Sequence, residues 1–184
     1  MFWAALATGA TLVQASAAPS PVIRAGLDSA ITACEQWVLN PATWVDGADG
    51  FPMASGLGNR LIPLPAVPDF ALPPLQARRA MHHWRVPLGE GGVFVTASDE
   101  VPVCHLAGGG PDDFERAVES ELASPPFLSR WLLQNTDVHA DLRSTRYVSK
   151  RDAKLLMIVT RANTPGARRD KVQFITTVQY SLGN

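Results

Sequence analysis

The stretch that decides the fold is residues 81–97, MHHWRVPLGEGGVFVTA. Its side chains change character at every second position, which is the period of a β-strand with two different faces. Residues 81–88 form the first predicted strand, the glycine-rich residues 89–92 form a turn, and residues 93–97 form the partner strand. A short turn between two such runs is typical of a β-hairpin. The sequence therefore predicts an antiparallel sheet that begins here.

More strands are expected after this hairpin. Residues 101–106 follow a second turn, and three strands close the chain at residues 141–149, 154–161 and 172–182. The middle strand of these three is almost uniformly apolar, as expected for a strand that is covered on both faces. The last strand alternates cleanly between apolar and polar side chains. Short connections between the strands favour antiparallel neighbours.

Two helices flank the first group of strands. Residues 22–39 place apolar side chains four, four, three and four positions apart, which makes one stripe along a helix. Residues 111–123 begin with a proline and carry acidic side chains in the first turn, as helix starts often do. A short helical turn is expected at residues 127–133. The stripe of the first helix consists of Ile23, Leu27, Ile31, Cys34 and Val38.

Together these elements predict an α+β fold with a single, mostly antiparallel sheet of about five to six strands. Two main helices should pack against the sheet, and the order along the chain is helix, strands, helix, three strands. Residues 18–184 are expected to form this single domain. The domain includes a proline-rich loop at residues 41–79, which holds six prolines within 23 positions. Its many apolar side chains predict an ordered loop that lies over a core surface and could cover a site.

Residues 1–17 are expected to be a signal peptide. They carry no charge, contain a mostly apolar run from residue 4 to residue 13, and end in the small-x-small sequence Ala15-Ser16-Ala17. No Lys or Arg precedes the run, so the start of the chain is expected to be truncated or misassigned. The run is far shorter than the ~20 apolar residues of a membrane span, and no transmembrane span is expected. These features favour a periplasmic or secreted bacterial protein.

If the protein is exported, its two cysteines are expected to form a disulfide. Cys34 and Cys104 are the only cysteines of the chain, so a disulfide in an oxidising compartment would have to join them. The bond would close a loop of roughly 70 residues, which stabilises a fold by about 4 kcal/mol. It would also fix the first helix to the third strand. Two buried free thiols are the alternative.

The net charge of −1 argues against a protein dedicated to nucleic acid. The charges are nevertheless unevenly placed. Residues 99–121 hold seven acidic residues and one Arg, whereas residues 141–171 hold nine basic and three acidic residues. One interpretation is a basic surface for an anionic envelope component or protein, whose candidate binding residues are Arg143, Arg146, Tyr147 and Lys150. The other is that the acidic helix and the basic strand ends neutralise each other.

Two histidines, His83 and His105, are the candidates for catalysis. Adjacent strand residues point to opposite faces, so His82 and His83 cannot act on one ligand. His83 and His105 would share a face if their strands pair in a suitable register, and a carboxylate could then complete a site beneath the proline-rich loop. No metal-binding, nucleophile or phosphate-binding motif occurs in the sequence, so neither a metal nor a cofactor is expected.

These patterns leave three hypotheses for the function. The lack of catalytic spacing favours the first, a non-enzymatic binding or envelope-associated protein. The second is a small periplasmic hydrolase or metal-dependent enzyme that uses His83 and His105. The third is a small-ligand sensing module with an apolar pocket lined by aromatic side chains such as Trp84 and Phe94.

Overall fold

The structure is a computed structural model that describes residues 18–40, 50–111, 113–164 and 172–181. The signal peptide predicted at residues 1–17 lies outside the described residues. The same holds for residues 41–49, which are the first part of the predicted proline-rich loop.

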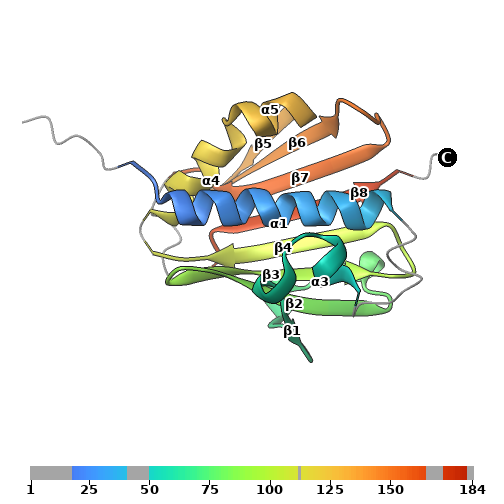
Figure 1. Ribbon diagram of the computed structural model, residues 1–184. Coiled ribbons are helices and arrows are strands. Elements are labelled where there is room, and N and C mark those ends of the chain that lie inside the picture. The colour runs from blue at the N-terminus through green and yellow to red at the C-terminus, as the bar shows by residue number, and fades with distance from the viewer. Residues whose placement is uncertain (1–17, 41–49, 112, 165–171, 182–184) are drawn as a thin grey trace, which may run out of the picture.

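The described residues form one antiparallel sheet of eight strands in the spatial order β1-β2-β3-β4-β8-β7-β6-β5 (Figure 1). Consecutive strands are neighbours within β1–β4 and within β5–β8, and β4 joins the two halves by pairing with β8, whereas β5 lies at the far edge. The sheet is therefore two meanders fused at its centre. The strands are β1 (Ile62–Leu64), β2 (Met81–Leu88), β3 (Gly91–Ser98), β4 (Val103–Gly109), β5 (Trp131–His139), β6 (Leu142–Ser149), β7 (Leu155–Ala162) and β8 (Phe174–Tyr180).

The described helices cover one face of this sheet, called here the helix face, and the opposite face is called the back face. The longest helix, α1, crosses the middle of the sheet and contacts β2, β3, β4 and β8 (Figure 1). α4 lies beside α1, and α5 leads directly into β5. The helices are α1 (Pro21–Leu39), α3 (Phe51–Ala54), α4 (Phe114–Leu122) and α5 (Pro125–Arg130).

α1 forms because its apolar stripe has the helical period and faces the sheet. Leu27, Ile31 and Trp37 on this stripe are fully buried. The Trp37 indole Nε1 donates a hydrogen bond of 2.7 Å to the main-chain oxygen of Ser98, so its polar atom is satisfied inside the core. The helix ends before Asn40, the residue that precedes a proline, as the sequence predicts.

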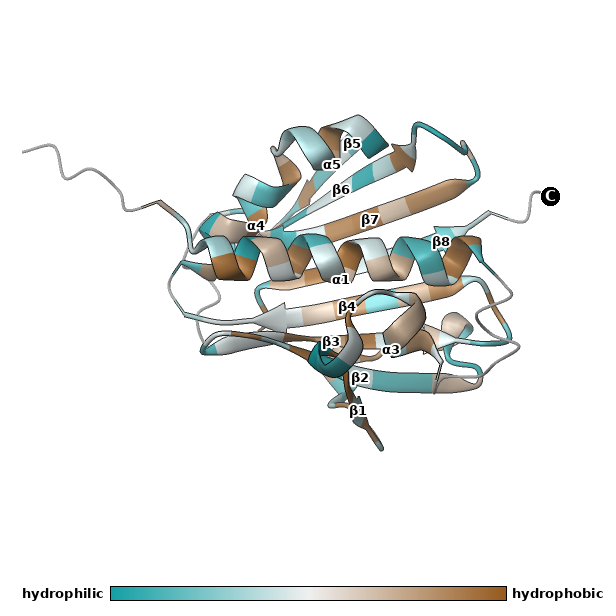
Figure 2. Cartoon of the chain, viewed as in Figure 1, coloured by the Kyte–Doolittle hydropathy of each residue, from teal (hydrophilic) through white to brown (hydrophobic). Residues whose placement is uncertain are grey.

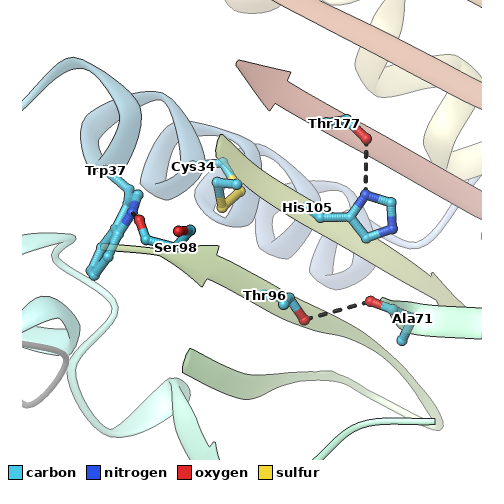
Figure 3. Close-up of a disulfide and its surroundings, with 8 residues drawn as sticks. Cys34, Trp37, Ala71, Thr96, Ser98, His105 and Thr177 are labelled. Atoms are coloured by element: carbon cyan, nitrogen blue, oxygen red, sulfur yellow. Dashed lines mark hydrogen bonds between the residues drawn. A yellow bond between two sulfur atoms is a disulfide. The ribbon is translucent and has the colours of Figure 1, made fainter. Parts of the chain in front are cut away.

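The predicted disulfide between Cys34 and Cys104 is confirmed. It joins α1 to β4 across a sequence separation of 70 residues, and both cysteines are fully buried (Figure 3). The bond therefore links the first helix to the centre of the sheet.

The predicted number of strands, about five to six, is wrong, because the sheet has eight. One missed strand is β1, which has only three residues and contains Pro63. The other is β5, in which Trp131 is buried and the other eight residues are exposed. A strand that buries so little has no alternation of apolar and polar side chains, and this alternation is what predicts a strand from sequence.

The prediction of two main helices is also wrong, because four helices occur among the described residues. α3 and α5 have four and six residues, too few to show a helical stripe. α5 begins where Ser124 accepts a hydrogen bond of 3.2 Å from the Phe127 main-chain nitrogen. The helical turn predicted at residues 127–133 is helical only up to Arg130, because β5 begins at Trp131. The order of helices and strands is otherwise close to the predicted one.

The two faces of the sheet are covered to different extents. On the helix face, alternate residues of β2, β3, β4, β6, β7 and β8 are buried, and β7 is hydrophobic along most of its length (Figure 2). On the back face, the proline-rich segment packs against β3 and β4 through a short 3-10 helix at Asp69–Ala71. Phe70 of this helix makes an edge-on ring contact with Phe94 at 6.0 Å.

Candidate functional site

The candidate site lies on the back face, along one row of directly opposed residues that crosses seven strands. From β2 to β5 the row consists of His83, Thr96, His105, Thr177, Ile158, Arg146 and Asn135. Residues that oppose one another in a sheet point to the same face. The register therefore places His83 and His105 on one face, with Thr96 between them.

The hydrogen bonds of the two histidines lead to different partners. His83 Nδ1 lies 3.3 Å from the Thr96 hydroxyl. His105 Nδ1 lies 2.9 Å from the Thr177 hydroxyl (Figure 3). Thr96 in turn donates to the Ala71 main-chain oxygen at 3.5 Å, which ties the proline-rich segment to the row. No cluster of three or more His, Cys, Asp or Glu side chains suited to a metal ion occurs in the part of the chain that the structure describes.

His105 is held in its neutral form. Its side chain is almost completely buried, with 3% of the residue exposed. Burial lowers the pKa of His105 to about 4, and the nearby Arg78 guanidinium adds to the lowering. The Nε2 atom has no hydrogen-bond partner among the described residues. Burial, and after it the neighbouring His82, lowers the pKa of His83 as well.

A groove of about 350 Å³ lies on the back face between the end of the proline-rich segment and the strands β4 and β8. We call it the β8 groove, because Thr177, Gln179 and Tyr180 of β8 form one side of it. The Thr177 hydroxyl that bonds to His105 thus belongs to its wall. The complete lining is Pro74, Gln76, Ala77, Val101, Pro102, Val103, Thr177, Gln179 and Tyr180.

The lining of the β8 groove is mostly apolar and uncharged. None of its lining residues carries a formal charge at neutral pH. The two glutamines offer amide donors and acceptors, and Thr177 offers a hydroxyl. The side chain of Tyr180 alternates with those of Thr177 and Gln179 and packs against the core on the helix face, where a hydrogen bond to Asp152 raises its pKa. The prolines and valines supply apolar surface between these groups.

The structure distributes the candidate binding residues over different surfaces. Arg146 is exposed on the back-face row, whereas Tyr147 is buried on the helix face against Phe127, with ring centroids 5.1 Å apart. Lys150 lies beyond the end of β6 and donates to the Leu128 main-chain oxygen at 2.7 Å. The fourth candidate, Arg143, faces α4.

Arg143 is part of an ion cluster that joins α4 to the sheet. The Glu119 carboxylate of α4 accepts hydrogen bonds from Arg143 at 2.7 Å and from the Nε of Arg161. Arg161 also donates to the Thr145 hydroxyl at 3.1 Å, and its side chain is only 9% exposed. Acidic helix and basic strands therefore neutralise each other at this point, which is the second of the two interpretations of the uneven charge.

Replacing the acid of this cluster is expected to loosen α4. Glu119→Gln should lower the free energy of unfolding by about 2 kcal/mol, because the buried Arg161 guanidinium loses its charged acceptor. Urea unfolding followed by circular dichroism measures this loss. Glu90→Gln, at an exposed turn, is the matched control and should change stability by less than about 0.5 kcal/mol. Equal losses in the two variants would show that the cluster contributes nothing.

A larger cavity, of about 480 Å³, lies on the helix side between the start of α1 and the α4–α5 connection. Two of its charged groups, Asp28 and Glu121, have partners that join the helices. Asp28 pairs with Arg130 of α5 at 2.8 Å, and Glu121 accepts from the Ser124 hydroxyl at 3.2 Å. Burial is the main cause that raises the pKa of Glu121. We read this cavity as a junction between helices.

The structure separates the two aromatic residues that the sequence suggested for an apolar pocket. Trp84 packs on the helix face against Phe51, whereas Phe94 lies on the back face, so these two aromatic side chains cannot line one pocket. His82 pairs with Asp99 across 3.0 Å on the helix face. The groove glutamines, Gln76 and Gln179, carried no signal in the sequence, because they are separated by about a hundred residues and meet only in the folded sheet.

The fold and the site together define an α+β protein whose antiparallel sheet is covered by helices over most of one face, β5 excepted, and partly by a proline-rich segment on the other. No family model, curated protein or solved structure matches the chain. None of the helices within the described ranges has the length and hydropathy of a membrane span.

Proposed function

We propose that the protein is an exported, non-enzymatic binding protein and that the β8 groove holds its ligand. The observation that carries this proposal is the uncharged lining of the groove, in which two amides and one hydroxyl lie among apolar side chains. Such a lining suits a neutral ligand, because a charged ligand would lose its hydration without gaining a counter-charge. The ligand class that fits is an uncharged molecule rich in hydroxyl groups, such as a neutral oligosaccharide.

Export is supported by the cysteines. A buried disulfide between the only two cysteines is typical of proteins in oxidising compartments, since cytosolic thiols are kept reduced. The signal-like residues 1–17 agree with this compartment. The periplasm or the cell exterior is therefore the proposed place of action.

Binding without turnover is supported by the two histidines. Each has a threonine hydroxyl as its partner, and no carboxylate among the described residues hydrogen-bonds to either ring. A histidine that acts as a general base usually titrates near the working pH. Burial keeps the pKa of His105 at about 4, so this side chain is suited to holding Thr177 in place in the groove wall.

A thermal-shift screen with neutral oligosaccharides tests the proposal. A ligand present at about 100 times its Kd stabilises a folded protein by about 2.7 kcal/mol, which should raise the melting temperature of a chain of this size by about 5 °C or more. The variant Gln179→Leu removes one groove amide and should abolish the shift. Gln36→Leu, at an exposed position on α1, is the control and should retain it.

Two results would count against this function. Stabilisation only by anionic or cationic ligands would place binding at another surface. If Gln179→Leu keeps the full rise in melting temperature with the oligosaccharide, the β8 groove is not the binding site.

A further inference from the structure

Thr177 connects the lining of the β8 groove to the buried side chain of His105. Its hydroxyl oxygen lies 2.9 Å from His105 Nδ1, and this ring is its only hydrogen-bond partner among the described residues (Figure 3). The groove glutamines, Gln76 and Gln179, end in amides that can both donate and accept. The role of Thr177 toward a ligand depends instead on which atom of the His105–Thr177 pair donates.

Two arrangements of protons satisfy the bond between His105 and Thr177. A neutral imidazole has one N–H donor and one acceptor nitrogen, and a hydroxyl has one O–H donor and two acceptor lone pairs. If Nδ1 carries the ring proton, His105 donates to Thr177 and the threonine O–H stays free. If Nε2 carries the ring proton, Thr177 must donate to Nδ1, and its oxygen can then only accept from a ligand.

The surroundings of Nε2 favour the proton on Nδ1. Nε2 is buried and has no hydrogen-bond partner among the described residues. His105 is 3% exposed, and the 3-10 helix at Asp69–Ala71 packs on this part of the sheet. An N–H at Nε2 would lose its hydration without gaining an acceptor, and buried donors of this kind are rarer in native proteins than acceptors that lack a donor. On Nδ1 the proton has the Thr177 oxygen as its acceptor.

We propose that His105 is a positioning residue, which donates from Nδ1 to Thr177 and thereby leaves the Thr177 O–H as a hydrogen-bond donor to the ligand in the β8 groove. The inference rests on the proposed function, because it concerns the same groove. It narrows the ligand class to neutral molecules that present an acceptor oxygen to Thr177, such as a ring, glycosidic or hydroxyl oxygen of a sugar. The two glutamines can adapt to either role, so Thr177 is the residue that selects.

Nuclear magnetic resonance of the free full chain, with histidine labelled with nitrogen-15, tests the position of the proton without any ligand. Long-range proton–nitrogen correlations identify which ring nitrogen is protonated. We expect His105 in the Nδ1–H form at pH 7. Its signals are assigned by their loss in His105→Asn, and by nuclear Overhauser contacts to Thr177 if that variant does not fold. An Nε2–H form of His105 would overturn the proposal.

Calorimetric titration with the neutral trisaccharides maltotriose and cellotriose tests the donor role of Thr177. Thr177→Val keeps the shape of the side chain without its hydroxyl and should weaken binding about tenfold. Thr177→Ser keeps the hydroxyl and is the matched control, so it should bind nearly as the wild type does. Circular dichroism establishes that each variant is folded.

The outcomes separate this inference from the proposed function. A trisaccharide that binds the wild type and Thr177→Val equally, but not Gln179→Leu, would refute the donor role and keep the groove as the binding site. If neither trisaccharide nor any other neutral oligosaccharide binds the wild type, the proposed function fails, and with it the role of Thr177 toward a ligand.

Discussion

Removal of the disulfide by the double substitution Cys34→Ala/Cys104→Ala is expected to lower the free energy of unfolding by about 4 kcal/mol. The bond spans 70 residues, and closing a loop of that length removes much conformational entropy from the unfolded chain. For a chain of this size, the melting temperature should fall by about 8–16 °C. Differential scanning calorimetry at neutral pH measures both quantities.

A reducing agent supplies the control for this prediction. Both cysteines are fully buried, so the wild-type protein is reduced with dithiothreitol in the unfolded state and refolded in the reductant. It should then melt at nearly the temperature of the double variant, which the same treatment should leave unchanged. Reduced wild-type protein that melts at the temperature of the oxidised protein would mean that the bond does not contribute to stability and that packing alone holds α1 on the sheet.

His105 is expected to make the protein sensitive to acid. The ordinary pKa of histidine is 6.5, and burial lowers the pKa of His105 in the folded protein to about 4. Between these values the unfolded chain binds a proton and the folded chain does not, so stability falls as the pH decreases. The contribution of the neutral His105 to the free energy of unfolding is fully present above about pH 6.5. About 3 kcal/mol of this free energy should be lost by pH 4.

The variant His105→Asn isolates this effect. Asparagine can keep a hydrogen bond to Thr177, but it does not titrate. The raised pKa values of Glu35 and Glu121 act in the opposite direction, since they stabilise the fold as the pH decreases, and they are common to both proteins. Urea unfolding at pH 7, 5.5 and 4 should therefore show the wild type losing stability relative to the variant. Parallel curves would mean that His105 is solvated in the folded protein.

The sequence predicts the parts of the fold that bury apolar surface. α1 and the strands near the centre of the sheet were found because packing on one or both faces imposes a period on their side chains. β5 was missed because eight of its nine residues are exposed, so its strand conformation depends on pairing with β6 and leaves no pattern in the side chains. β1 was missed because proline is disfavoured in strands and the element is short.

The candidate site could be predicted only in part, because it depends on register. The sequence places His83 and His105 on strands, but only the pairing of β2 with β3 and of β3 with β4 brings them into one row. A shift of one residue would have moved either ring to the opposite face. The same dependence separates Arg146 from Tyr147, which are adjacent in the sequence and lie on opposite faces.

The proposed place of action is tested most directly by the intact mass of the protein recovered from its own host, measured before and after reduction and alkylation. We expect a chain that starts at Ala18 and is two hydrogen masses lighter until it is reduced. An uncleaved chain with two free thiols would contradict export and the closed Cys34–Cys104 bond together, and with them the proposal of an exported binding protein.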